Sequence, residues 1–212
     1  MSDFRYVYLH GFASSAFSVK GVALAERLRG TVELERAELN RPSFAKLSHA
    51  AMLAELDALY ARDPRPFRVV GSSLGGWLAA RFAELHPERV DRLVLLCPGF
   101  RLVERWPAIV GDEGWARWER DGELEIPDAE KRPVRVHYGF VEEARTQPAE
   151  PEVTQPTVIV HGVRDAIVPI AFSRAYASSH PNVRLVEVDD DHALGASIDR
   201  IEAEVRACFE LG

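Results

Sequence analysis

The chain has 212 residues and carries 26 Lys and Arg against 33 Asp and Glu, which gives a formal net charge of −7. Its content of 47% hydrophobic and 28% charged residues is typical of globular proteins and excludes disordered and fibrous classes. The length favours one compact domain spanning residues 1–212. The acidic balance and the lack of long Lys/Arg runs argue against binding to nucleic acid or to an anionic membrane. We therefore expect a small-molecule substrate as the partner.

The cellular location is predicted from what the sequence lacks. It contains no apolar stretch of roughly 18 to 20 residues, and its N-terminus shows no basic region followed by an apolar run. This predicts a cytoplasmic protein. Cys97 and Cys208 lie in apolar stretches and are interpreted as buried thiols, with a disulfide or a catalytic role as the alternative. Neither cysteine has metal-ligand spacing, and no cofactor is predicted. The sequence makes no prediction of oligomeric state.

Strand-like and helix-like segments alternate along the chain. Apolar runs predict strands near residues 4–9, 31–39, 67–70, 93–97, 158–160 and 183–188. Helical spacing follows over residues 19–29 and over 43–61, with Ser43 as N-cap. A third helix is predicted from the Gly-rich turn at 71–76 to about residue 85, and two more over residues 168–178 and 196–210. This alternation predicts a doubly wound α/β fold with a mostly parallel sheet of about six strands.

The pattern breaks between Pro98 and Pro156, where the sequence is charged, Trp-rich and without a strand-like run. We predict a helical cap inserted after the fourth strand, over about residues 100–156, within the single domain. Its aromatic side chains are candidates for lining an apolar acyl pocket, and packing as the insertion's own core is an equally good interpretation. These candidates are Phe100, Trp106, Trp115 and Trp118.

A motif at the third strand points to nucleophilic chemistry. Gly71-Ser72-Ser73-Leu74-Gly75 fits G-x-S-x-G at the point where a strand gives way to a helix. A sharp turn there would raise the Ser73 hydroxyl above the sheet edge, and the small residues on either side make room for it. We predict that Ser73 is a nucleophile. The alternative is a Gly-rich turn with a capping serine.

A serine hydroxyl needs a base, and a carboxylate must then orient that base. Of the seven histidines, His192 follows the final strand and is expected at the same sheet edge as Ser73. Asp165 follows the penultimate strand and fits the chain order serine, acid, histidine. Its alternative role is an exposed loop acid beside Arg164. The acids 189–191 are rivals, although they are interpreted as a solvated turn.

Two backbone N–H groups are predicted to form an oxyanion hole. One belongs to Leu74, directly after the nucleophile, and the other to Phe12, in the loop after the first strand. Gly11 would allow that loop to approach closely, and His10 is interpreted as a structural histidine that bonds loop backbone.

These motifs resemble those of the small YqiA-like serine esterases of the α/β-hydrolase superfamily. The resemblance rests on Leu9-His10-Gly11-Phe12-x-Ser14-Ser15-x-x-Ser18-x-Lys20, on residues 71–76, on Asp165 and on Asp191-His192-Ala193. It implies an α/β-hydrolase fold, a cofactor-free esterase, the triad Ser73, Asp165 and His192, and oxyanion donors at Phe12 and Leu74. Because the first strand begins near residue 4, the sheet is expected to lack the two strands that precede it in larger members.

The sequence thus predicts a serine esterase that cleaves small carboxylic esters through an acyl-enzyme on Ser73. A thioesterase, another acyl-transfer enzyme or a hydrolase of carbon–carbon bonds would use the same three groups. A non-catalytic binding protein on a hydrolase fold is an alternative of a different class. A broken triad would mark that alternative, and here all three members are present.

Overall fold

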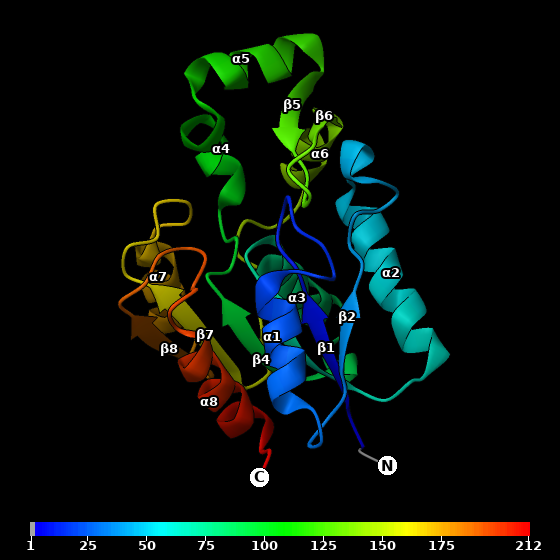
Figure 1. Cartoon of the computed structure of the whole chain (residues 1–212), viewed down its shortest axis with the longest axis vertical. Coiled ribbons are helices and arrows are strands. Elements are labelled where there is room, and N and C mark those ends of the chain that lie inside the picture. The colour runs from blue at the N-terminus through cyan, green and yellow to red at the C-terminus, as the bar shows by residue number, and fades with distance from the viewer. Residues whose placement is uncertain (1–2) are drawn as a thin grey trace.

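The computed structural model describes residues 3–212 and contains the expected six-stranded parallel sheet (Figure 1). The strand order is β2-β1-β3-β4-β7-β8, and each neighbouring pair is parallel. The strands are β1 (Arg5–Leu9), β2 (Leu34–Ala37), β3 (Phe67–Ser72), β4 (Val90–Leu96), β7 (Thr157–Gly162) and β8 (Val183–Val188). Because all six run in the same direction, the loops that follow them meet at one edge, the carboxyl edge of the sheet.

Helices cover both faces of this sheet. On one face lie α1 (Val19–Leu28) and α8 (Ile198–Phe209), and on the other lie α2 (His49–Arg62), α3 (Leu74–Leu85) and α7 (Ile170–Ser179). Successive strand residues enter the two opposite cores: Val69 packs on the α2–α3 side and Val70 on the α1–α8 side, and both are buried. Burial on both faces explains why the strands are continuous apolar runs rather than alternating ones.

The helix predicted over residues 43–61 is divided in the structure. A short 3₁₀ turn, Phe44–Lys46, precedes α2, and the Ser43 hydroxyl accepts from the Lys46 N–H. Leu47 is then extended, and the Ser48 hydroxyl accepts from the Ala51 N–H to start α2. The prediction that Ser43 caps the long helix is therefore wrong, because two serines each provide a cap.

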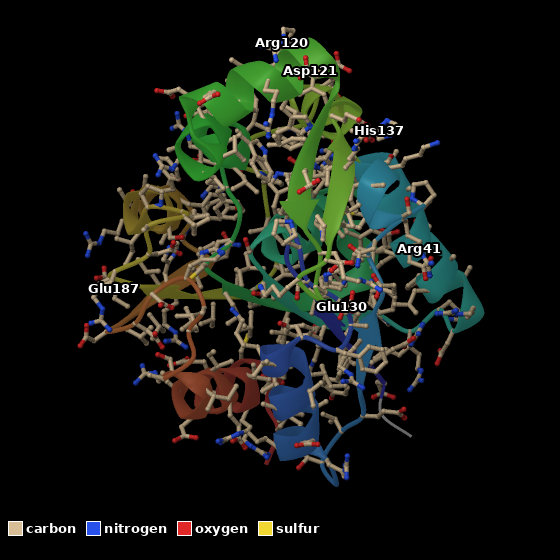
Figure 2. All side chains as sticks on the ribbon, turned by 45° about the horizontal axis from the view of Figure 1, so that its top comes forward. Arg41, Arg120, Asp121, Glu130, His137 and Glu187 are labelled. Atoms are coloured by element: carbon tan, nitrogen blue, oxygen red, sulfur yellow. The ribbon has the colours of Figure 1, made fainter. Side chains whose placement is uncertain are left out.

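The segment 100–156, which we call the insertion, rises above the carboxyl edge of the sheet (Figure 1). It contains α4 (Leu102–Val110), α5 (Asp112–Asp121), β5 (Glu123–Pro127), β6 (Pro133–His137) and α6 (Gly139–Ala144). Its three helices agree with the predicted helical cap, but the prediction that the segment has no strand is wrong, because β5 and β6 form an antiparallel hairpin. Figure 2 shows Arg120, Asp121 and Glu130 on the outer surface of the insertion, whereas its apolar residues Trp118, Leu124 and Val136 are buried.

The remaining short element is the 3₁₀ turn Pro87–Arg89, between α3 and β4. Within residues 3–212, no helix is both long enough and apolar enough to cross a bilayer.

Candidate active site

Ser73 lies on a strained turn between β3 and α3. Its backbone angles are φ 52° and ψ −118°, a left-handed conformation that L-residues rarely adopt. A Cβ on Gly71 would lie 2.4 Å from the carbonyl oxygen of Gly75, and a Cβ on Gly75 would lie 2.3 Å from that of Leu9. Both positions therefore require glycine, and the tight packing holds the serine in a conformation that costs about 1–3 kcal/mol.

The structure brings Ser73, His192 and Asp165 together at the carboxyl edge of the sheet. His192 Nε2 lies 3.0 Å from Ser73 Oγ, and its Nδ1 lies 2.6 Å from Asp165 Oδ2. The carboxylate accepts a hydrogen bond from Nδ1–H, which leaves the Nε2 lone pair free to accept the serine proton. This arrangement can activate a hydroxyl nucleophile.

Asp165 is held as an ionised carboxylate. Its side chain is fully buried, and Oδ1 accepts the backbone N–H groups of Ile167 and Val168, each at 2.8 Å. Burial alone would raise the pKa of Asp165, but hydrogen bonds from His161 and His192 outweigh it and hold that pKa below its usual range. The group can therefore orient an imidazolium without taking its proton.

The other acids near His192 have different partners. Asp189 is exposed and pairs with Arg164, so Arg164 does not engage Asp165. Asp190 accepts from the Ser197 hydroxyl at 2.7 Å and from the Ala196 N–H at 2.9 Å. Because Asp190 is buried, the prediction of a solvated turn is wrong at that position.

A second histidine, which is fully buried, supports the acid, and sequence reasoning missed this role. His161 Nε2 lies 3.2 Å from Asp165 Oδ2 and 2.9 Å from the carbonyl oxygen of Val168. Its Nδ1 lies 2.8 Å from the hydroxyl of Ser173. Both His161 and Ser173 have 0% exposed surface, so this second serine–histidine pair is closed to substrate. The only hint of this contact in the sequence is the four-residue spacing from His161 to Asp165.

The loop that carries Phe12, one of the two expected oxyanion donors, lies against the nucleophile, and Leu74, the other, directly follows it in the chain. A Cβ on Gly11 would lie 3.2 Å from Ser73 Cβ, which brings the loop carrying Phe12 against the serine. In the part of the chain that the structure describes, the N–H groups of Phe12 and Leu74 donate to no other residue. His10 bonds loop backbone, as predicted, through Gly11 O at 2.9 Å and the Leu39 N–H at 3.0 Å.

A cleft of about 520 Å³, the catalytic cleft, opens in front of Ser73 and His192. Of the four aromatic candidates in the insertion, Trp106 lines this cleft. Phe100 instead packs on Tyr176, with ring centroids 4.4 Å apart, and Trp118 is fully buried in the insertion. Trp115 packs edge-on against Trp118 and does not line the cleft. Packing as the insertion's own core therefore describes more of these side chains than does pocket lining.

One group of side chains has metal-ligand spacing among residues 3–212: Cys97 Sγ, an Asp165 oxygen and a His192 nitrogen lie within 4.8 Å of one another. Burial raises the pKa of the Cys97 thiol, so this sulfur is protonated and a poor ligand. Because Asp165 and His192 already hydrogen-bond each other, the group does not fit a metal ion well. Cys97 and Cys208 are both free and buried, as predicted.

Solved structures share this fold. Est1E from Butyrivibrio proteoclasticus superposes with a TM-score of 0.75 at 21% identity, over 99% of this chain and 88% of that one. A second Est1E structure, with ferulic acid bound, gives 0.77. Alpha/beta hydrolase domain-containing protein 10 from mouse gives 0.73 at 24% identity, over 97% of this chain and 89% of that one. The predicted α/β-hydrolase fold is thereby confirmed.

Two curated relatives show sequence similarity over shorter regions. The pimeloyl-[acyl-carrier protein] methyl ester esterase of Chromobacterium violaceum is 31% identical over 63% of this chain and 65% of that protein. The mouse mitochondrial palmitoyl-protein thioesterase ABHD10 is 34% identical over 49% of this chain and 37% of that protein. The matches thus span less than two thirds of either relative. The model of UPF0227, described as an uncharacterised protein family, matches residues 5–207, so the chain belongs to this family.

Proposed function

We propose that this protein is a serine hydrolase that cleaves small carboxylic esters through an acyl-enzyme on Ser73. The observation that carries the proposal is the continuous hydrogen-bonded chain from Ser73 Oγ through His192 to Asp165, at 3.0 and 2.6 Å. The similarity to an esterase and to a thioesterase supports the same class of reaction.

The first half of the reaction acylates the serine. Ser73 Oγ attacks the ester carbonyl carbon while its proton moves to His192 Nε2, and the Phe12 and Leu74 N–H groups stabilise the negative oxygen. The carbon–oxygen bond to the alcohol then breaks, and His192 gives its proton to the departing alkoxide. Asp165 stays ionised throughout and stabilises the imidazolium.

The second half releases the acid. Water takes the place of the alcohol, His192 accepts one of its protons, and the hydroxide oxygen bonds to the acyl carbon. Collapse of the intermediate breaks the bond to Ser73 Oγ and returns the proton to the serine. The products are the free acid and the alcohol, and the enzyme is regenerated without a cofactor.

A thioester passes through a similar oxyanion, so thioester hydrolysis is the second candidate, favoured by the similarity to the mouse thioesterase. Comparing kcat/KM for matched oxygen esters and thioesters of the same acid distinguishes the two. Binding without catalysis is the weakest alternative, because a binding protein gains nothing from a base aligned on a strained serine.

A fluorophosphonate probe tests the nucleophile directly. We expect stoichiometric labelling of the folded protein and, by peptide mass spectrometry, a single modified site at Ser73. Ser73→Ala should remove the label, whereas Ser173→Ala should leave Ser73 as the labelled residue, because the Ser173–His161 pair is fully buried. No labelling of folded wild-type protein, or labelling at Ser173, would overturn the proposal.

A further inference from the structure

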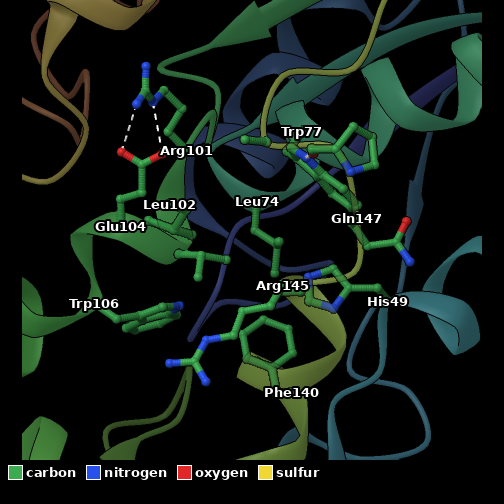
Figure 3. Close-up of a pocket in the computed structure, with 15 residues that line it drawn as sticks. His49, Leu74, Trp77, Arg101, Leu102, Glu104, Trp106, Phe140, Arg145 and Gln147 are labelled. Atoms are coloured by element: carbon green, nitrogen blue, oxygen red, sulfur yellow. Dashed lines mark hydrogen bonds and ion pairs between the residues drawn. The ribbon is translucent and has the colours of Figure 1, made fainter.

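A second cavity lies beside the catalytic cleft, between α2, α3 and the insertion (Figure 3). It has a volume of about 230 Å³, and we call it the His49 cavity. Its walls are mainly apolar and aromatic, formed by His49, Leu74, Trp77, Leu102, Trp106 and Phe140. Leu102 and Trp106 also line the catalytic cleft, so the two spaces adjoin each other.

His49 is the unusual member of this lining. It is only 3% exposed, and Figure 3 shows its imidazole pointing from α2 into the cavity. The ring stacks on Phe140, with centroids 4.6 Å apart, and meets Trp77 edge-on at 5.2 Å. Within residues 3–212, no group hydrogen-bonds either ring nitrogen. Nδ1 is the ring atom that is buried without a partner, and Nε2 also accepts no hydrogen bond from the described residues, so a ligand can supply a partner to Nε2.

The charge state of the ring indicates what kind of ligand group fits. Burial lowers the pKa of His49 to about 4, so the ring is neutral near pH 7. Its Nδ1 lies 3.8 Å from the carboxylate of Glu143, which favours the tautomer with the proton on Nδ1. The Nε2 lone pair is then available to the cavity as an acceptor, and it requires a donor such as a hydroxyl group.

The position of the cavity indicates which half of an ester it receives. His192 must protonate the leaving alcohol, so that half belongs beside His192 in the catalytic cleft. We place the acyl half on the opposite side of the same carbonyl, toward Leu74. The side chain of Leu74 lines the His49 cavity, while its N–H serves the proposed oxyanion hole.

We propose that the His49 cavity binds the acyl half of the substrate and that His49 Nε2 accepts a hydrogen bond from a hydroxyl group at the far end of the acyl chain. The preferred substrates are then esters of hydroxy acids whose apolar portion packs against the Trp106 and Phe140 side chains that line the cavity. This inference rests on the proposed esterase function and specifies its substrate class.

Three methyl esters with the same alcohol test the proposal: 3-(4-hydroxyphenyl)propanoate, its 4-methoxy analogue and unsubstituted 3-phenylpropanoate. In the wild type we expect kcat/KM about tenfold higher for the hydroxy ester than for the unsubstituted one, the worth of one hydrogen bond to a buried acceptor. The methoxy ester, which cannot donate, should show no such gain.

Variants at position 49 then test whether His49 causes the preference for the hydroxy ester. In His49→Phe, which keeps a flat ring against Phe140, the hydroxy-to-unsubstituted ratio should fall to about one, and in His49→Gln it should be intermediate. A ratio measured within one variant cancels losses from partial unfolding. His137→Phe, at an exposed position on β6 outside the cavity, should keep the wild-type ratio.

The outcomes separate the two proposals. If no ester is hydrolysed by wild-type protein, the esterase function fails. If all three are hydrolysed with a ratio near one, or if His49→Phe retains the preference, the esterase function stands and the His49 cavity is not the hydroxyacyl site. Should His49→Phe fail to fold, the comparison of hydroxy and methoxy esters on wild-type protein still decides the proposal.

Discussion

The carboxyl edge of the sheet and the insertion above it face the same cleft but are built by different means. At the sheet edge, the backbone fixes the candidate catalytic groups: Ser73 by its left-handed turn, and Asp165 by two N–H groups at 2.8 Å. In the insertion, packing between side chains holds the elements in place. Trp106 meets Trp118 edge-on with centroids 5.3 Å apart, and the indole N–H of Trp118 donates to Val136 O at 2.8 Å.

This difference divides the expected roles. Backbone contacts tolerate few substitutions, so the sheet edge suits chemistry that must be the same for every substrate. Aromatic packing can be rearranged by single substitutions, so the insertion suits the recognition of particular acyl groups. Substitutions at the sheet edge should therefore abolish turnover, whereas substitutions in the insertion should change the stability of the insertion and the preference for substrates.

The largest effect is expected from Asp165→Asn. An amide lacks the negative charge that favours the Nδ1–H tautomer, and its NH₂ group can donate to Nδ1, so the imidazole favours the wrong tautomer, and kcat should fall by about 10³–10⁴-fold. Steady-state hydrolysis of a short p-nitrophenyl ester measures this kcat. Asp189→Asn is the matched control, because Asp189 is exposed and pairs with Arg164, and it should change kcat little. An unchanged rate in Asp165→Asn would refute the assigned acid.

The sequence predicted the sheet edge far better than the insertion. Strands such as Val183–Val188 are signalled by local apolar runs, and the elbow around Ser73 by its glycines, because each depends on neighbours in the chain. The hairpin of β5 and β6 was missed because each strand has only two large apolar residues and a proline at one end. Short alternation of this kind is indistinguishable from a loop until a partner strand is known.

The candidate site was likewise predicted where its geometry follows from topology. Ser73, Asp165 and His192 each follow a parallel strand, so the order of the strands brings them to one edge. His49 could not be predicted in this way. Its burial depends on Phe140 and Glu143 in α6, some 90 residues further along the chain. No motif near position 49 indicates that α6 packs there.

A second prediction tests whether the insertion has a core of its own. Trp118 has 0% exposed surface, and Trp118→Ala should cost about 3–5 kcal/mol of stability. We expect the loss to be local, so amide hydrogen exchange should quicken in α4, α5, β5 and β6 and stay unchanged in β3 and β4. Trp115→Ala, at a half-buried position, should have a smaller effect. Equal loss of protection in β3 and β4 would show that the two regions unfold together.

The smallest effect concerns the boundary between the two regions, where His49 of α2 packs under α6 of the insertion. Burial lowers the pKa of His49 from 6.5 to about 4. Above pH 6.5 the ring is neutral in both the folded and unfolded states, so it contributes no pH dependence. Below pH 6.5 the unfolded chain protonates His49, whereas the folded protein does so only near pH 4. The free energy of unfolding therefore falls as the pH is lowered from 6.5 to 4.

In His49→Phe this acid sensitivity is removed. Between pH 7 and pH 4 the wild type should therefore lose about 3 kcal/mol more of its free energy of unfolding than the variant does. Urea unfolding at a series of pH values measures the difference, with His137→Phe as the exposed control. Parallel pH profiles for wild type and His49→Phe would mean that the folded protein protonates His49 as readily as the unfolded chain. The ring would then be open to water, and the contact between α2 and the insertion looser than the stacking on Phe140 requires.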